Sequence, residues 1–459
     1  MRGTIARSPP RWRQSLRRHG IRHPARLVPL GFLAAILIGT LLLMLPASHA
    51  GEGSAPLLTA LFTSTSAVCV TGLIVVDTPV YWSTFGQVVI MLLFQIGGFG
   101  IMTGATLLGL LVTRRLGLGT RLIAQAETRS LGLGDVTAVL RLVLRTTLAV
   151  EALIAAVLTL RLHYAYGESW GRAAWNGVFH AISAFNNAGF STYSDNVMRF
   201  VSDPLFVVPL MLAIVIGGIG FPVLHDIRQN FTRWSRWSVH SKLTLAGTAF
   251  LVAGGALAIG LFEWHNARTI GSLGIGGKML TALFHSISAR TAGFNSVDVG
   301  AMQVETLAVN YALMFIGGGS AGTAGGIKVT TFVLLGAVVL AEIRGSTDTT
   351  VFRRRISPEV VRLALTVVLL GVAVLAFATL ALLAVSSLPL HEVMFEAISA
   401  FATVGLSTGI TAKLPEAGQY VLILLMFVGR VGTITVATAL ALRAREPLYR
   451  YPEERPIVG

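Results

Sequence analysis

The chain has 459 residues, of which 54% are hydrophobic and 12% are charged, with a mean hydropathy of +0.72 and a net charge of +15. Several uncharged apolar runs reach about 20 residues, the length that crosses a bilayer core of about 30 Å. These values exclude an ordinary soluble globular protein and indicate a polytopic membrane protein with membrane lipids around it. The positive-inside rule accounts for the positive charge, so nucleic acid is not expected as a partner. The single cysteine, Cys69, excludes a disulfide within the chain and a cysteine-based metal cluster.

The distribution of charge predicts the topology. Residues 1–26 form an arginine-rich tail, and the apolar run after it is too long for a signal-peptide core, so we expect a retained tail in the cytoplasm. A second basic loop at 113–135 carries Arg114, Arg115, Arg121 and Arg129. The loops that would face the other side instead contain acids: Glu52, Asp77, Glu168, Asp195, Asp203, Asp298 and Glu305. We therefore place both termini in the cytoplasm of a bacterial inner membrane.

One sequence pattern occurs four times. It reads FTSTSAVCVTGL at 62–73, FHAISAFNNAGF at 179–190, FHSISARTAGF at 284–294 and FEAISAFATVGL at 395–406. Each copy opens with Phe, carries a Ser-Ala pair and closes on a glycine. The period of roughly 110 residues indicates one structural unit used four times. Because each copy lies between two long apolar segments, the unit is a membrane helix, a short re-entrant pore helix and a second membrane helix.

We therefore predict an all-α polytopic membrane protein with eight spans, arranged as four such repeats around a pseudo-fourfold pore. The expected spans lie at about 27–46, 80–112, 138–162, 204–225, 242–263, 303–342, 359–385 and 415–442, with the first pore helix near 54–69. The predicted division is a basic cytoplasmic tail at 1–26, repeat 1 at 27–112, repeat 2 with its preceding cytoplasmic loop at 113–226, repeat 3 at 227–342, repeat 4 at 343–443 and a cytoplasmic tail at 444–459.

The glycine that closes each copy predicts a selectivity filter. Non-helical backbone at membrane depth is tolerated where it lines a water-filled path or is buried in protein, and glycine accepts backbone angles that turn carbonyls inward. Rings of backbone carbonyls replace the hydration shell of a cation. The predicted filter, with K⁺ held by backbone carbonyls only, consists of Val70, Thr71, Gly72, Asn187, Ala188, Gly189, Thr291, Ala292, Gly293, Thr403, Val404 and Gly405. The alternative is that these glycines only relieve crowding in a helix bundle; the shared flanking residues favour the filter.

Two details qualify the fourfold pattern. The third copy has five residues from Ser288 to Gly293, where the other copies have six, so the filter need not be exactly symmetric in sequence. The C-terminal end of each pore helix carries about half a negative charge, which favours a cation in the pore.

A dense run of small residues interrupts the sixth predicted span. The sequence GGGSAGTAGGIKVTT occupies 317–331, and each glycine costs a helix about 1 kcal/mol relative to alanine. We interpret it as an intramembrane loop that acts as a gate beneath the filter; a glycine-lined helix contact is the alternative. Its predicted members are Gly317, Gly318, Gly319, Ser320, Ala321, Gly322, Thr323, Ala324, Gly325, Gly326 and Lys328. Lys328 itself is either a cytoplasmic anchor or a packing residue, and the sequence leaves both open.

Arg430 occupies a position where the other three repeats have glycine. The second spans contain FQIGGFG, VIGGIG, FIGGGS and FVGRVG, which align Gly98, Gly218, Gly318 and Arg430. A charge near the centre of a span costs about 2.5–3.5 kcal/mol on insertion scales, so it normally faces a cavity or a partner. We expect Arg430 to raise the barrier for cations and to hold the loop through its carbonyls. The alternative is an arginine that extends to the inner membrane surface.

Other motifs are weaker. The stretch GSLGIGGKM at 271–279 departs from a phosphate-binding loop at Ser272 and Met279, so we reject that function. His180 and His285 have no second ligand at metal-binding spacing and are expected to pack within pore helices. Arg290 and Glu396 are predicted to lie within the re-entrant helices, where either the filter backbone or other helices could be their partners. An intramembrane enzyme would need paired carboxylates or a His-rich metal site in the spans, and the sequence shows neither. A carrier with inverted repeats would need repeats of opposite orientation, whereas these four repeats each begin and end in the cytoplasm and share one orientation.

The four repeats, the segments TGL, NNAGF, RTAGFN and TVGLS, the run GGGSAGTAGGIK and the arginine of GRVGT together resemble the Trk/Ktr/HKT superfamily of potassium transporters. The resemblance covers nearly the whole chain after residue 26. The eight-span length and the four filter glycines are most similar to KtrB, the membrane subunit of Ktr potassium uptake systems, because Trk-type relatives usually carry two extra N-terminal spans. A Trk-type K⁺ or Na⁺/K⁺ symporter subunit is the alternative.

This resemblance implies further properties. Members are homodimers with one pore per protomer, gated by a cytoplasmic ring of nucleotide-binding regulatory subunits of the KtrA/TrkA kind. The chain itself would need no cofactor; K⁺ is the transported ion, and uptake in Ktr systems commonly depends on Na⁺. The intramembrane loop corresponds to 317–328 and the inner-pore arginine to Arg430. Plant relatives with serine at the first filter glycine favour sodium, so Gly72 implies potassium.

Overall fold

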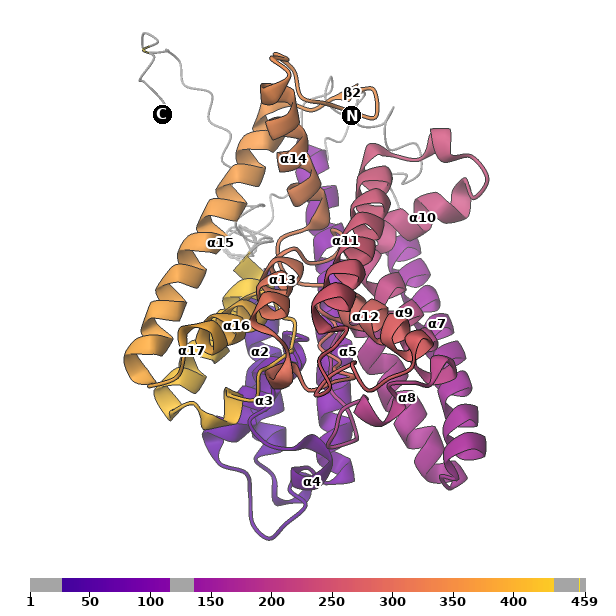
Figure 1. Ribbon diagram of the computed structural model, residues 1–459, viewed down its shortest axis with the longest axis vertical. Helices are drawn as coiled ribbons and strands as arrows, with labels where there is room; N and C mark the ends of the chain where they lie inside the picture. The colour runs from indigo at the N-terminus through magenta and orange to yellow at the C-terminus, as the bar shows by residue number, and fades with distance from the viewer. Residues whose placement is uncertain (1–26, 116–135, 433–453, 455–459) are drawn as a thin grey trace, which may run out of the picture.

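The computed structural model describes residues 27–115, 136–432 and Glu454 (Figure 1). The predicted basic tail at 1–26, Arg121, Arg129, residues 433–443 of repeat 4 and all of the predicted C-terminal tail except Glu454 lie outside the described residues. Within the described ranges the chain is almost entirely helical. The strands found there are β1 (Thr350–Val351) and β2 (Arg354–Arg355), which pair as one short antiparallel hairpin.

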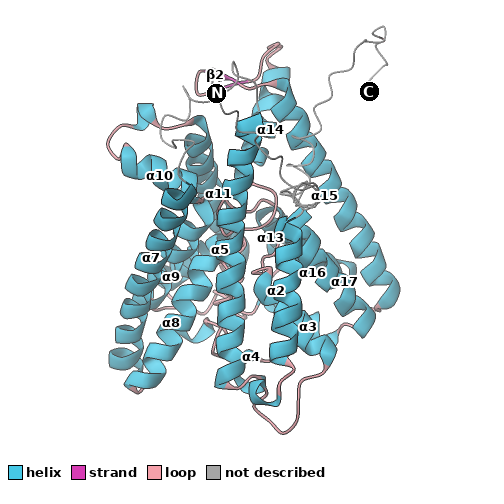
Figure 2. Cartoon of the chain, turned by 180° about the vertical axis from the view of Figure 1, so that it is seen from behind, coloured by secondary structure: helices cyan, strands magenta, loops and turns pink. Residues whose placement is uncertain are grey.

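The helices repeat in the predicted order, a long helix, a re-entrant helix and a second long helix (Figures 1 and 2). Repeat 1 consists of α2 (Leu27–Leu43), α3 (Leu57–Val68) and α5 (Thr84–Arg115), and repeat 2 of α7 (Val136–Tyr166), α8 (Trp170–Asn186) and α9 (Pro204–Ile219). Repeat 3 consists of α11 (Val239–Glu263), α12 (Ile275–Ser288), α13 (Val304–Phe315) and α14 (Val329–Ile343), and repeat 4 of α15 (Pro358–Val385), α16 (Leu390–Phe401) and α17 (Glu416–Phe427). This arrangement confirms the predicted fold class.

Short elements join these helices. They are η2 (Pro46–Ser48), α4 (Thr78–Tyr81), η3 (Met198–Phe200), α10 (Phe221–Gln229), η4 (Trp234–Arg236), η5 (Val299–Ala301), η6 (Thr411–Lys413) and a π-helical turn, η7 (Val428–Gly432).

The second span of repeat 2 is shorter than predicted. Helix α9 begins at Pro204, whose fixed φ suits a first helical position, and the carboxylate of Asp203 accepts a hydrogen bond from the Leu205 N–H. The residue after its last turn is Gly220, which has φ +91°, and the chain bends by 98° between α9 and α10. The predicted span at 204–225 therefore stops at Ile219. A glycine in this conformation followed by Phe221 and Pro222 bends the chain where the apolar pattern alone predicted continuity.

The sixth predicted span, 303–342, is broken. Helix α13 ends at Phe315 and α14 begins at Val329, so residues 316–328 form non-helical backbone between them. In the described part of the chain, α5, α7, α11 and α15 are long and apolar enough to cross a membrane, and the bent pair α9–α10 could count as a fifth. Helices α2, α13 and α14 are shorter apolar helices, and α17 continues into η7 where the described residues end.

The four repeats close into a ring. The second long helix of each repeat contacts the re-entrant helix of the next repeat: α5 contacts α8, α9 contacts α12, α13 contacts α16, and α17 returns to α3. Figure 2 shows α2, α3 and α5 in front, with α15–α17 on one side and α7–α9 on the other. The four re-entrant helices are thus brought around one axis.

Burial separates the inner helices from the outer ones. The phenylalanine that opens each sequence copy is fully buried in the re-entrant helix, at Phe62, Phe179, Phe284 and Phe395. By contrast, the helices around them expose large apolar side chains: Phe377 on α15 is 76% exposed, and Leu41 on α2 and Leu261 on α11 are each 68% exposed. A contiguous apolar exterior of this kind is suited to lipid. The re-entrant helices therefore form the core, and the long helices shield it.

Candidate functional site

The site begins with four short backbone segments, residues 70–72, 187–189, 291–293 and 403–405, which we call the filter segments. Each follows the C-terminal end of a re-entrant helix. The first residue of each segment has positive φ, at Val70 (56°), Asn187 (59°), Thr291 (79°) and Thr403 (50°). The third residue is glycine and also has positive φ, at Gly72 (92°), Gly189 (71°), Gly293 (75°) and Gly405 (96°).

This alternation distinguishes the filter segments from ordinary strands. A regular strand has negative φ at every residue, whereas these segments have positive φ at every second residue. The β-branched residues Val70, Thr291 and Thr403 adopt this conformation against their steric preference. Strain of this type persists only where the surrounding structure imposes it, and it is concentrated at functional sites.

The four filter glycines form a closed ring. A methyl group placed on Gly189 would lie 2.8 Å from the Ala292 carbonyl oxygen and 3.0 Å from the Gly293 Cα. The same group on Gly72 would meet the Ala188 carbonyl, on Gly293 the Val404 carbonyl, and on Gly405 the Thr71 carbonyl. Each glycine therefore faces the filter segment of the next repeat, and the fourth faces the first. No side chain fits between neighbouring segments, which explains glycine at these positions better than general crowding does.

A serine in each re-entrant helix holds the filter segment that follows it. The backbone carbonyls of Ser66, Ser183, Ser288 and Ser399 accept from the N–H groups of Thr71, Ala188, Ala292 and Val404 at 2.7–2.8 Å. The hydroxyls of Ser66 and Ser399 accept from the filter glycine N–H at 3.1 Å, and that of Ser183 donates to the Phe190 carbonyl at 2.8 Å. The sequence showed a serine in every copy, but its role became visible only in the fold.

The shorter third copy keeps the same filter geometry. Its helix α12 ends at Ser288 itself, whereas α3 and α16 continue two residues beyond their serines to Val68 and Phe401. The missing residue is thus removed from the helix end, and Thr291 and Gly293 retain the positive φ values of the other segments. Arg290 consequently lies just beyond the helix rather than within it, which corrects the sequence-based placement.

The glycines that recur in the second spans of the four repeats serve two purposes. Gly97, Gly217 and Gly429 pack directly against the carbonyls of Val68, Phe185 and Phe401 at the ends of the pore helices, so here the close-packing interpretation holds. The next residue is Gly98, Gly218, Gly318 or Arg430. Gly218 and Gly318 both lie against Ala324, and Arg430 binds the neighbouring Thr323, whereas Gly98 lies against Asn186. Three of the four aligned positions therefore meet at one place.

The glycine-rich loop, residues 317–328, lies against the inner side of the filter segments. The Thr323 N–H donates to the Gly217 carbonyl at 3.1 Å, and its hydroxyl donates to the Phe185 carbonyl at 3.1 Å. Farther along, Gly325 packs against Ala402 and Thr403 of repeat 4. The loop therefore crosses from repeat 2 to repeat 4 and contacts the ends of their pore helices next to the filter segments.

Two basic side chains hold the second half of this loop. Arg430 is 2% exposed, and its Nη1 donates to the Thr323 carbonyl at 2.6 Å. It lies in the π-helical turn η7, a distortion often found at functional sites. The Lys328 ammonium folds back to donate to the Ala324 carbonyl at 2.6 Å. The structure thus supports a packing role for Lys328 and shows a loop contact for Arg430 instead of an extended side chain at a surface.

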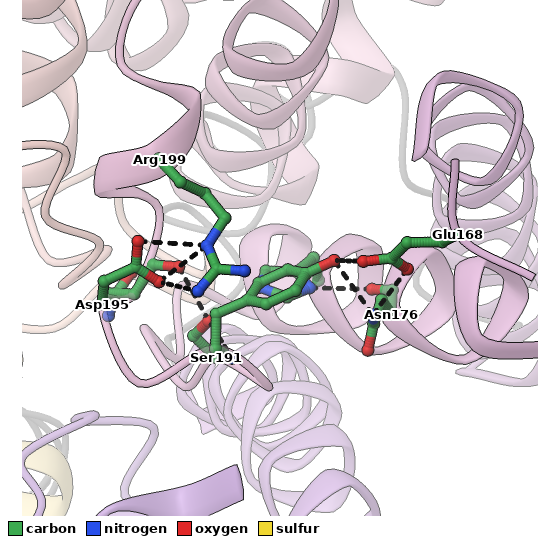
Figure 3. A network of polar contacts seen from close by, with 8 residues as sticks. Glu168, Asn176, Ser191, Asp195 and Arg199 are labelled. Atoms are coloured by element: carbon green, nitrogen blue, oxygen red, sulfur yellow. Dashed lines mark hydrogen bonds and ion pairs between the residues drawn. The ribbon is translucent and has the colours of Figure 1, made fainter. Parts of the chain in front are cut away.

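The opposite face of the filter opens into a cavity of about 140 Å³. Gly72, Gly189, Asp77 and Asp195 all line it. Asp195 is paired with Arg199, whose Nη2 lies 2.8 Å from Oδ1 and whose guanidinium stacks over the Tyr193 ring at 4.5 Å (Figure 3). Asp195 therefore has an arginine partner, whereas Asp77 has no ion pair among the described residues. Both acids line the same cavity next to two filter segments.

Two residues that line this cavity, Tyr193 and Asp195, belong to a network of polar contacts. Figure 3 shows Glu168 and Asn176 on one side of the network and Asp195 and Arg199 on the other. The Tyr193 hydroxyl donates to Glu168 at 2.7 Å and accepts from Asn176 at 2.9 Å. Burial raises the pKa of Tyr193, so its hydroxyl keeps its proton and remains a donor. Glu168 and Asp195 therefore have structural roles in this network.

Three of the remaining candidates, His180, Glu396 and Lys278, have hydrogen-bond partners. His180 is fully buried and contacts the Asn176 carbonyl and the Ser191 hydroxyl, as expected for a packing residue. Glu396 in α16 accepts a hydrogen bond from the Thr411 hydroxyl. The Lys278 ammonium of the rejected phosphate-loop motif donates to the Trp264 carbonyl at 2.7 Å. Among the described residues, no group of His, Cys, Asp and Glu is arranged to hold a metal ion.

Comparison with known proteins identifies the family. Residues 11–446 match the TrkH family, described as cation transport proteins. The chain belongs to the TrkH family. It is 40% identical over 438 residues to Ktr system potassium uptake protein B of Bacillus subtilis (strain 168), covering 95% of this chain and 97% of that protein. It is 38% identical to the protein of the same name from Vibrio alginolyticus, covering 95% and 94%, and 34% identical to the potassium/sodium uptake protein NtpJ of Enterococcus hirae, covering 95% and 97%.

The fold agrees with this assignment. The crystal structure of the potassium transporter TrkH from Vibrio parahaemolyticus superposes with a TM-score of 0.73 at 18% identity, covering 93% of this chain and 86% of that one. Family membership confirms the sequence-based resemblance and the prediction of a multi-pass membrane transport protein that is not an enzyme. The repeat boundaries, the orientation of the termini and the roles of individual residues stay predictions.

Proposed function

We propose that this chain is the pore-forming membrane subunit of a bacterial potassium uptake system of the Ktr type. The four filter segments would bind K⁺ through backbone carbonyls, and the ion's electrochemical gradient would drive uptake without covalent catalysis. The observation that carries this proposal is the closed ring of four glycines with alternating left-handed backbone. The names of the relatives at 40% and 38% identity support the choice of ion.

The glycine-rich loop and Arg430 would form the gate. The loop crosses beneath the filter segments, and a positive charge at this depth opposes cation passage. Opening would require the loop to leave the Arg430 guanidinium. A homodimer of this chain with a cytoplasmic ring of nucleotide-binding subunits would control that step, in keeping with a "system" in the names of the relatives.

A second candidate is a Trk-type subunit that transports both K⁺ and Na⁺. The relative NtpJ, whose name includes both ions, is 34% identical over 95% of this chain and favours this candidate. Sodium would then be either an activator or a second transported ion. Glycine at all four filter positions favours potassium over this alternative.

Ion-dependent stability tests the filter separately from the gate. A ligand that binds only the folded state stabilises it, and above the dissociation constant the stabilisation grows with the logarithm of the ligand concentration. We expect the full-length protein in detergent to unfold at a higher temperature in KCl or RbCl than in NaCl or choline chloride. Gly405→Ala should remove the difference, because its methyl group would displace the Thr71 carbonyl. Gly254→Ala is the matched control, since a methyl group there meets nothing within 4 Å. Equal unfolding temperatures in all four salts would contradict the proposed filter.

A further inference from the structure

One position in the repeats breaks their pattern. In repeats 1, 2 and 4, the glycine directly before the aligned position of the second span (Gly97, Gly217 and Gly429) packs on a backbone carbonyl at the end of its own pore helix. In repeat 3 the corresponding residue is Gly317, which packs instead against Gly325 within the glycine-rich loop. In repeat 3 the contact between pore helix and second span is therefore replaced by a contact within the glycine-rich loop. This is the repeat whose second span is broken between α13 and α14.

Arg290 occupies the resulting interface. Its Nη2 donates to the Gly317 carbonyl at 3.0 Å, and the side chain is 7% exposed. Counted back from the filter glycine, the same position holds Cys69 in repeat 1, Asn186 in repeat 2 and Ala402 in repeat 4. Arg290 is also the residue directly before Thr291, the first residue of the third filter segment. One side chain thus joins the backbone of a filter segment to the start of the loop.

The cost of burying the Arg290 charge requires that the guanidinium have a specific partner. An arginine buried at membrane depth is costly unless its charge has a specific partner, and hydrogen bonds from a charged donor are stronger than neutral ones. Arg290 makes this bond to a carbonyl, and its Nε has no partner among the described residues. A cavity of about 20 Å³ beside it, lined also by Asn187, Thr248 and Gly318, is large enough for about one water molecule.

We infer that Arg290 is a positioning residue that fixes the start of the glycine-rich loop to the third filter segment. Arg430 binds the same loop at Thr323, six residues later, from repeat 4. Two arginines therefore hold the two halves of the loop, and release of its first half must also disturb the backbone that precedes Thr291. This inference rests on the proposed role of the loop as a gate and adds a mechanical link between that gate and the filter.

Thiol labelling tests the inference without relying on transport. Ser320→Cys places a thiol in the loop, and the native Cys69 is buried and unreactive by comparison. In this background, Arg290→Gln should increase the rate of maleimide labelling about 10- to 100-fold, the scale expected for losing one charged hydrogen bond. Arg290→Lys should cause a smaller increase, because it keeps the charge. Arg268→Gln, an exposed arginine in the same repeat, should leave the rate unchanged.

The outcomes separate this inference from the proposed function. A labelling rate within twofold of the parent in both Arg290 variants would overturn the link to the loop. Loss of the K⁺-dependent rise in unfolding temperature with unchanged labelling would mean that Arg290 supports only the filter. If Arg290→Gln does not fold, Arg290→Lys decides alone, because it must still label faster than the parent. Absence of K⁺-dependent stabilisation in the parent would contradict the filter and would say nothing against the labelling result.

Discussion

Replacing Arg430 with glutamine should open the pore. The guanidinium is 2% exposed and donates a 2.6 Å hydrogen bond to the Thr323 carbonyl in the middle of the glycine-rich loop. The shorter, neutral glutamine would lose both this contact and the positive charge beneath the filter. The hydrogen bonds from Thr323 to the Gly217 and Phe185 carbonyls would remain, so the loop would be loosened but not detached.

The size of the effect follows from the contact that is lost. A hydrogen bond from a charged donor contributes about 1.5–3 kcal/mol, and each 1.4 kcal/mol is a factor of ten in an equilibrium. The ratio of open to closed loop should therefore rise about 10- to 100-fold. Removal of the buried charge adds to the rate, because an arginine near the centre of a span repels the permeating cation.

Tracer uptake of ⁸⁶Rb⁺ into proteoliposomes measures this change directly. The purified chain, without any regulatory subunit, should show low uptake, and Arg430→Gln should raise the initial rate by at least the lower end of the range. Arg430→Lys keeps the charge with a single donor group and should lie between the two. An initial rate for Arg430→Gln equal to that of the parent would refute the role of Arg430 as a barrier and a loop anchor.

Three further predictions concern other parts of the molecule. Gly72→Ser should lower the ratio of K⁺ to Na⁺ flux, because Gly72 has φ +92° and its side chain would press on the Ala188 carbonyl; an unchanged ratio would argue against the carbonyl filter. Arg199→Gln should increase uptake about two- to fivefold at low ion concentration, and less in high salt, because Asp195 in the cavity beside Gly72 and Gly189 loses its cationic partner. Asp195→Asn should not increase uptake, and a gain in that variant too would contradict the explanation. Asp226→Ala removes three hydrogen bonds from the start of α11 and should lower stability by about 1–3 kcal/mol, seen as a lower unfolding temperature in detergent; no shift would show that this contact is dispensable.

Much of this architecture could be predicted because its signals are local. The repeated pattern around Gly72, Gly189, Gly293 and Gly405 located the filter segments, since glycine at a crowded axis has no substitute. The dense glycines at 317–326 predicted the break between α13 and α14 for a similar reason, because helix propensity there is low over many residues.

Other features depend on contacts between distant residues and could not be predicted. The bend at Gly220 looks in sequence like one more glycine in an apolar run, and only its φ of +91° distinguishes it. The hydrogen bond from Arg290 to Gly317 joins residues 27 positions apart, and the missing residue of the third copy concealed that Arg290 lies past the helix end. Lys328 had two equally plausible roles until the fold showed its carbonyl partner.

The most direct test of the central claim is ion selectivity of flux through the purified protein. Initial rates for K⁺, Rb⁺ and Na⁺ should be compared in proteoliposomes, using the Arg430→Gln variant so that the gate does not limit the rate. The account predicts that K⁺ and Rb⁺ flux well exceeds Na⁺ flux and that Gly405→Ala in the same background abolishes this preference. Equal flux of K⁺ and Na⁺ through the variant with four intact filter glycines would contradict it.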